Sequence, residues 1–101
     1  MMLAWILYDI SDNKIRNRIA AVCKDYGFTR YQKSVFCGEA HERILAILLD
    51  RIKDEMALSD EKEDSVLVFT VCDTCMKNRF EIGKKMDLKN FIKKPRLIII
   101  G

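Results

Sequence analysis

Asp9 is the residue of this chain whose type and position best suit it to chemistry. It follows an apolar run at residues 3–8, and the helix predicted after it begins with Lys14, Arg16 and Arg18. Carboxylate oxygens bind hard divalent cations, while lysine and arginine bind phosphate. This arrangement predicts a site at the end of a strand where phosphate chemistry takes place.

One carboxylate is too few for a magnesium site, which needs several oxygen donors from the protein or the substrate. In a two-fold dimer, however, an isologous interface could bring Asp9 of each subunit to the symmetry axis. The pair could then hold one hydrated Mg²⁺, or Mn²⁺, that activates water or steadies a phosphate during in-line displacement. The alternative is that Asp9 is a turn residue with no further role.

Four cysteines and one histidine are the other residues with chemical potential. Cys72 and Cys75 have the spacing of half a zinc site, but Cys23 and Cys37 stand singly, so a second pair is missing. A redox role would need a thioredoxin-type context, which the order of elements does not supply. We therefore expect reduced thiols with a packing role. His41 has no partners for a catalytic triad, and no glycine-rich phosphate loop is present, which excludes the common enzyme classes.

Composition favours one folded domain, because the chain has 101 residues and half of them are hydrophobic. The net charge is only +3, but both ends of the chain are basic and residues 39–64 are acidic, which permits a nucleic-acid-binding face. The apolar start lacks the basic region and cleavage site of a secretory signal, and no segment is long enough to span a membrane. We expect a cytoplasmic protein with reduced thiols.

Hydrophobic periodicity predicts the order strand, helix, strand, strand, helix, strand. The predicted helices cover residues 13–26 and 40–56, and the predicted strands cover residues 3–8, 28–32, 34–39 and 65–71. Two split βαβ units of this kind form a ferredoxin-like α+β sandwich, with an antiparallel four-stranded sheet and both helices on one face. The first strand would be central. The face without helices would need a cover, so we expect a homodimer.

The last thirty residues contain a turn at the Cys72–Cys75 pair and a short strand candidate at residues 80–83. Residues 84–101 form a basic tail that ends in a strand-like run at residues 97–100. We therefore divide the chain into a ferredoxin-like domain, residues 1–83, and a C-terminal tail, residues 84–101. The terminal strand would leave an open edge, so we expect it to pair with a second chain.

Three stretches of the sequence resemble the CRISPR-associated Cas2 family: YDISD at residues 8–12, RNR at 16–18 and YGFTRYQKSVFCG at 26–38. The resemblance covers about four-fifths of the chain and implies a ferredoxin-like homodimer that acts in the acquisition of CRISPR spacers. It also implies a metal-dependent endonuclease acting on RNA or DNA, or a non-catalytic centre that holds duplex DNA beside the Cas1 integrase.

The family's functional positions fall on six residues of this chain. The metal-binding aspartate corresponds to Asp9, the strand-end tyrosine to Tyr8, the helix arginines to Arg16 and Arg18, and the hairpin residues to Arg30 and Phe36.

Three hypotheses remain open from the sequence. The first is a Mg²⁺-dependent phosphodiesterase that acts on single-stranded RNA or on DNA, with slow turnover because few acid or base groups are present. The second is a dimeric adaptor that binds duplex DNA through backbone contacts and recruits the integrase Cas1. The third is a ferredoxin-like toxin-type or RNA-binding domain unrelated to CRISPR, although the exposed aromatic pair of an RNA-binding sheet is not identifiable.

Overall fold

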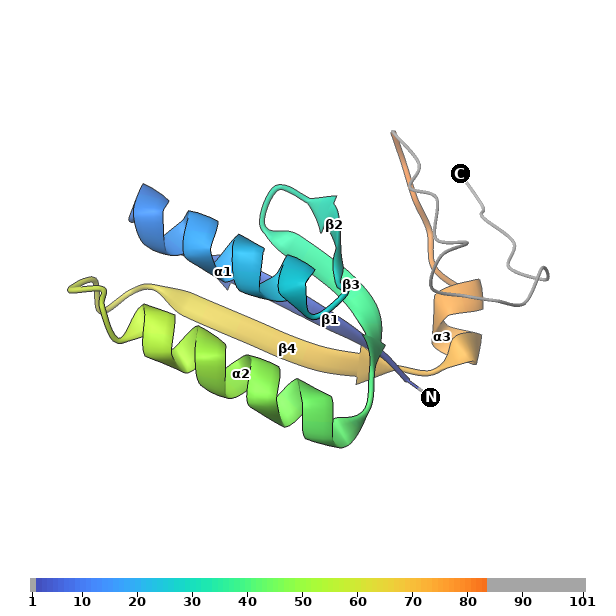
Figure 1. Ribbon diagram of the computed structural model, residues 1–101. Helices are drawn as coiled ribbons and strands as arrows, with labels where there is room; N and C mark the ends of the chain where they lie inside the picture. Colours follow the sequence, from blue (N-terminus) through green and yellow to red (C-terminus); the bar gives the residue numbers. More distant parts are fainter. Residues whose placement is uncertain (1, 84–101) are drawn as a thin grey trace.

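The structure, a computed structural model, describes residues 2–83 (Figure 1). Its elements are β1 (Met2–Asp9), α1 (Asn13–Asp25), β2 (Thr29–Gln32), β3 (Val35–Ala40), α2 (Glu42–Met56), β4 (Ser65–Val71) and α3 (Asp73–Lys77). The predicted order of six elements is confirmed, and α3 is an addition to it. Among the described residues, no helix has the length and apolar character needed to cross a membrane.

The four strands form one sheet in the order β2-β3-β1-β4, and every neighbouring pair is antiparallel. β1 is therefore an inner strand, as its continuous apolar run predicts. The pairing of β2 with β3 shifts register between Arg30 and Gln32, next to the hairpin turn. With both long helices on one face of the sheet (Figure 1), this is the predicted ferredoxin-like α+β arrangement.

The main core lies between the sheet and the helices. Ile6 of β1 and Phe36 of β3 are fully buried there against Ile19 of α1 and against Leu48 and Ile52 of α2. Successive side chains of a strand alternate between faces, so Ala4, Ile6 and Tyr8 are the part of β1 that supplies this core. The strand is positioned by burial, and its last residue is positioned with it.

The opposite face of the sheet carries a smaller apolar cluster. Leu3 and Cys37 are buried there beneath Met76 of α3, and Trp5, Tyr31 and Val71 pack around them. Farther along the same face, Leu67 and Phe69 of β4 are 59% and 42% exposed. α3 thus covers one end of the helix-free face and leaves the other end apolar and open.

Helix α1 begins and ends with local signals that the sequence shows. The Asp12 carboxylate accepts hydrogen bonds from the backbone N–H groups of Lys14 and Ile15, at 2.8 and 3.1 Å. Asp12 is therefore the N-cap of the helix. Gly27 follows the helix with a φ of 83°, a left-handed conformation that glycine adopts without steric cost.

Three sequence predictions are corrected by the structure. Helix α2 begins at Glu42 and not at Ala40, because Ala40 pairs with Met2 in the sheet and His41 is the N-cap. The segment after β4 is the short helix α3 and not a simple turn. The strand candidate at residues 80–83 forms only a single bridge, at Phe80. Phe80 and Ile82 are 79% and 99% exposed, so an extended strand here buries little of its apolar surface.

The prediction of packing roles for the cysteines is only half right. Cys23 and Cys37 are fully buried, and burial raises their thiol pKa values to about 11 and about 12. Cys72 and Cys75 are exposed, because they flank the first turn of α3 on its solvent side, so packing does not account for them. The predicted strand at residues 97–100 and the tail lie outside the described residues.

Candidate metal and nucleic-acid site

Asp9 is the last residue of β1, and it is exposed opposite Ser65 of β4. Because Tyr8 points into the main core, alternation along the strand places the Asp9 side chain on the helix-free face. Among residues 2–83, no basic side chain forms an ion pair with Asp9. The central strand therefore presents a carboxylate to solvent from a rigid support.

The loop that follows Asp9 is tied to the loop between α2 and β4 by Asp64. The Asp64 carboxylate accepts hydrogen bonds from the backbone N–H and the hydroxyl of Ser11, both at 3.0 Å, and from the hydroxyl of Ser59 at 2.8 Å. These bonds, first that from Ser59 and then those from Ser11, lower the pKa of Asp64 below its ordinary value of 3.8. The carboxylate thus stays ionised and holds the two loops together.

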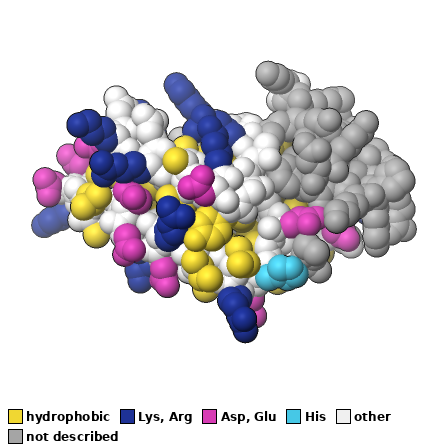
Figure 2. Space-filling view, viewed as in Figure 1, with side chains coloured by type: hydrophobic (Ala, Val, Ile, Leu, Met, Phe, Trp, Pro, Cys, Tyr) yellow, Lys and Arg dark blue, Asp and Glu magenta, His cyan; other side chains and the backbone are white. Residues whose placement is uncertain are grey.

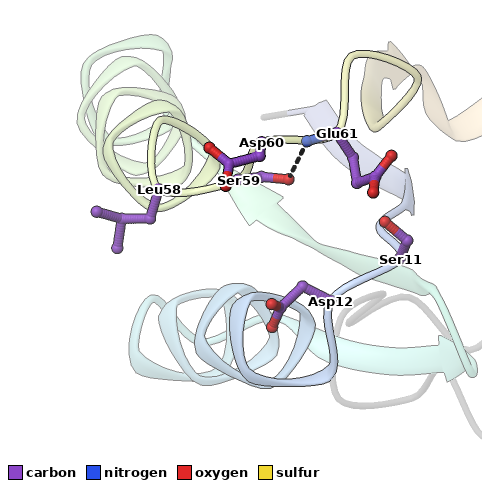
Figure 3. Close-up of a pocket in the computed structure, with 6 residues that line it drawn as sticks. All are labelled: Ser11, Asp12, Leu58, Ser59, Asp60 and Glu61. Atoms are coloured by element: carbon purple, nitrogen blue, oxygen red, sulfur yellow. Dashed lines mark hydrogen bonds between the residues drawn. The ribbon is translucent and has the colours of Figure 1, made fainter.

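The two loops enclose a polar hollow beside that bond network. Figure 3 shows its lining from Ser11 and Asp12 on one side and from the loop after α2 on the other, with the Ser59 hydroxyl accepting a hydrogen bond from the Glu61 backbone N–H at 3.1 Å. Its charged side chains, Asp12, Asp60 and Glu61, are all acidic. An anionic phosphate would be repelled here, so this hollow does not bind the nucleic-acid backbone.

A basic pocket lies on the other side of the strand end, beside the turn between β2 and β3. Its lining residues are Arg16, Asn17, Arg30, Lys33 and Ser34, and its volume is about 260 Å³. That volume is slightly below the range for drug-sized ligands, and it suits a phosphate group of a longer polymer. Three cations and no carboxylate line it, so it is suited to bind a phosphate.

Two hydrogen bonds to backbone carbonyls join the basic pocket to the residues on either side of Asp9. The Tyr8 N–H donates to the Ser34 carbonyl at 3.0 Å, and the Arg16 guanidinium donates to the Ile10 carbonyl at 3.2 Å. Arg16 also donates to the side chain of Asn13 in its own helix turn. Arg16 therefore leans back over the strand end, where it contacts the Ile10 carbonyl and not the Asp9 carboxylate.

Tyr8 and Phe36 lie below the pocket and do not line it. They are 5% and 0% exposed and stack on one another with ring centroids 6.2 Å apart. The Arg30 guanidinium lies 5.2 Å from the centre of the Phe36 ring, within the range of a cation–π contact. The two rings therefore support Arg30 from inside the core, and burial excludes their direct contact with a substrate in this conformation.

Arg18 points away from this group. Its exposed guanidinium lies 3.8 Å from the half-buried Glu55 carboxylate of α2 and so links the two long helices. Of the six sequence-predicted residues, the structure brings Tyr8, Arg16, Arg30 and Phe36 together around the basic pocket. Asp9 lies at the same end of the sheet but on its other face, and Arg18 is separate from both.

Charge on the helix-bearing face is mixed. Figure 2 shows basic and acidic side chains interspersed around apolar ones on this face. Ile44 and Ile47 of α2 are 39% and 44% exposed, so two large apolar side chains of this helix face solvent. The concentration of positive charge without a carboxylate is therefore a property of the basic pocket and not of the whole face.

Comparison with known proteins decides the family. The family model described as CRISPR associated protein Cas2 matches residues 1–79. This chain belongs to that family.

Relatives within the Cas2 family extend along most of the chain. A CRISPR-associated endoribonuclease Cas2 1 from Methanospirillum hungatei is 33% identical over 85 residues, which cover 84% of this chain and 86% of that protein. A CRISPR-associated endoribonuclease Cas2 from Korarchaeum cryptofilum is 33% identical over 82 residues, which cover 78% and 82% of the two chains. The crystal structure of Streptococcus pyogenes Cas2 at pH 6.5 superposes with a TM-score of 0.68 at 24% identity, covering 81% of this chain and all of the other, and shows that the fold is shared.

The donor set of this Cas2-family chain fits half of a metal site. No group of three or more metal-binding side chains occurs within the described part of the chain. Asp9 supplies an exposed carboxylate on the open, apolar face of the sheet, and carboxylate oxygen is the donor that Mg²⁺ prefers. A second chain placed on that face would be needed to supply the other donors.

Sequence reasoning missed Asp64 and Lys33. Asp64 accepts its hydrogen bonds from a serine that lies 53 positions earlier in the chain, and no local sequence pattern predicts a contact between residues so far apart. Lys33 was recognisable only as a turn residue, although the QKS turn next to Arg30 does carry a second cation. Two cations within four positions of a hairpin are a signal that could have found the pocket.

Proposed function

We propose that the protein is a homodimeric, metal-dependent nuclease of CRISPR spacer acquisition, which hydrolyses phosphodiester bonds in RNA or DNA. The observation that carries this proposal is the exposed Asp9 carboxylate at the end of the buried central strand. The Asp64 bonds fix the loop beside it, and the basic pocket lies across the same strand end. The names of the relatives, CRISPR-associated endoribonucleases, agree with this chemistry.

The exposed apolar side chains of the helix-free face support the proposed homodimer. Leu67 and Phe69 are exposed on that face, and covering them would remove apolar surface from water. Asp9 follows Leu7 on the same face of β1 and opposes Ser65, one pair beyond the open end of the apolar strip. A two-fold axis near this point would bring the two Asp9 carboxylates together.

Within the site, each residue has a distinct part in the proposal. Asp9 of both subunits would hold Mg²⁺ or Mn²⁺, and that ion would supply an activated water molecule and neutralise charge on the phosphate. Arg16, Arg30 and Lys33 bind a phosphate of the substrate backbone and so orient the chain. Tyr8 and Phe36 hold Arg30 in place through the ring contact. Arg18 binds Glu55 and contributes a positive charge at longer range.

The experiment that tests the proposal compares Asp9→Asn with the wild-type protein on single-stranded RNA and duplex DNA, with and without Mg²⁺. We expect Asp9→Asn to lose at least about a hundredfold in cleavage rate, because the metal supplies most of the chemistry. Asp25→Asn is the matched control, since it removes one exposed carboxylate at the far end of α1 and should leave the rate unchanged. Cleavage by Asp9→Asn at the wild-type rate would refute the nuclease.

A second function, that of a non-catalytic adaptor, is favoured by the basic pocket itself. Three cations face solvent there without a carboxylate among them, which suits sequence-independent binding of duplex DNA. In this case Asp9→Asn should leave both duplex binding and spacer acquisition intact. Replacing Arg30 and Lys33 together should weaken duplex binding and reduce its salt dependence.

Partner binding completes the adaptor proposal. We propose that residues 1–83 form the folded domain, and that the basic tail, residues 84–101, docks on the integrase Cas1 in the cytoplasm by strand addition. A protein that ends at residue 83 should then still dimerise and fail to bind Cas1. If the shortened protein binds Cas1 as the full chain does, the tail has no such role.

A further inference from the structure

The two cysteines after β4 form a close and accessible pair. Both are exposed, and their sulfur atoms lie 3.6 Å apart, which is contact distance. The backbone is already folded into the tight turn that brings them together, because the Met76 N–H donates to the Cys72 carbonyl at 3.1 Å. A disulfide has a sulfur–sulfur bond of about 2.05 Å, so a small side-chain rotation would close it.

The two thiols are not equivalent. Backbone N–H groups, above all that of Cys75, together with the Cys75 thiol, lower the pKa of Cys72. Contact with Cys72 raises the pKa of Cys75. At neutral pH, Cys72 therefore carries more thiolate and is the better attacking sulfur, while Cys75 is the second, resolving thiol.

We propose that Cys72 and Cys75 form a reversible dithiol–disulfide site, which exchanges with small-molecule disulfides such as oxidised glutathione. The Cys72 thiolate attacks one sulfur of the disulfide, forms a mixed disulfide and releases one thiolate. The Cys75 thiolate then attacks the Cys72 sulfur, closes the Cys72–Cys75 bond and releases the second thiolate. The protein loses two protons and two electrons, and the small disulfide is reduced to two thiols.

The site has a structural consequence, because α3 is the element that covers one end of the helix-free face. Met76, the residue after Cys75, is buried against Leu3 and Cys37. The segment beyond is tied back, since Arg79 donates to the Met76 carbonyl at 2.7 Å and binds Glu81 at 2.8 Å. The disulfide closes the first turn of α3 and so holds Met76 on the sheet.

The test is a titration of the full-length protein with oxidised and reduced glutathione, followed by acid quenching, thiol alkylation and peptide mass spectrometry. We expect a loss of two hydrogen atoms on the peptide that carries Cys72 and Cys75, reversed by reduced glutathione. Cys23 and Cys37 serve as internal controls and take up no glutathione, because both are fully buried. Cys75→Ser should accumulate the glutathione mixed disulfide on the order of tenfold more than the wild-type protein, because nothing resolves it.

Three results would overturn the proposal. One is a wild-type protein that stops at the mixed disulfide, and another is oxidation that yields disulfide-linked dimers and no internal bond. The third is a stoichiometric zinc ion that blocks oxidation until a chelator removes it, which would make the pair a metal site. The effect of the disulfide on α3 is tested by hydrogen exchange. Oxidation should slow exchange of the Met76 amide, and an unchanged exchange rate would refute the proposed stabilisation of α3.

Discussion

Replacement of Gly38 by alanine tests whether β3 depends on its close packing against Phe28, which lies between α1 and β2. A Cβ atom at position 38 would lie 2.8 Å from two ring atoms of Phe28 and 3.1 Å from its backbone Cα. Phe28 is only 3% exposed and packs in the main core, so neither group can move freely. Overpacking of this kind costs about 1–3 kcal/mol. For a domain of this size, that corresponds to a fall in Tm of roughly 4–8 °C per kcal/mol.

The assay is urea unfolding of the wild-type protein, Gly38→Ala, Phe28→Leu and the double variant. If the Phe28 ring causes the strain, the smaller leucine relieves it, and the two changes together cost less than the sum of the single changes. A coupling free energy of at least about 0.5 kcal/mol is expected for residues in direct contact. Additive costs, or a Gly38→Ala protein as stable as the wild type, would refute the packing argument.

Two further perturbations follow from the ionised groups. Asp64→Asn should lower Tm at neutral pH, because the lowered pKa of Asp64 in the folded state stabilises the fold above pH 3.8. This stabilisation is lost as Asp64 is protonated, so the difference in Tm between the variant and the wild-type protein should shrink as the pH falls below 3.8. An equal difference in Tm at about pH 7 and about pH 3 would contradict the role of the carboxylate charge. Arg79→Ala should cost about 3–5 kcal/mol in urea unfolding, because it removes the guanidinium 2.8 Å from a nearly buried carboxylate, that of Glu81. Lys62→Ala, which removes an exposed cation, is the control, and an equally small effect of both changes would show that the Arg79–Glu81 pair is not a structural tie.

The sequence predicts those parts of the fold that depend on short-range patterns, such as apolar runs, helical stripes and helix-capping residues. The apolar run at residues 3–8 indicates an inner strand because both of its faces are covered, and the stripe of residues 15, 19 and 22 places α1 on the sheet. Asp12 and Gly27 mark the ends of that helix through their own preferences. The element order then selects the ferredoxin-like sandwich.

The parts that could not be predicted depend on contacts between distant segments. Sequence spacing cannot show that Arg18 binds Glu55 of α2, or that Arg16 turns to the Ile10 carbonyl, because both lie on the same first turns of α1. The missing second cysteine pair predicts a packing role for Cys72 and Cys75. The five-residue helix α3 exposes them instead, and a helix this short leaves no apolar repeat in the sequence. In each case a side chain's direction is set by tertiary packing, which periodicity does not record.

The crystal structure of the protein grown with Mn²⁺ tests the central claim most directly, because the anomalous signal of manganese locates the ion. The proposed nuclease predicts one ion between two subunits, bound by both Asp9 carboxylates at about 2.1 Å, so that the two bound oxygens lie within about 4.2 Å of one another. A dimer whose Asp9 carboxylates lie more than about 10 Å apart, with the ion elsewhere, would contradict it.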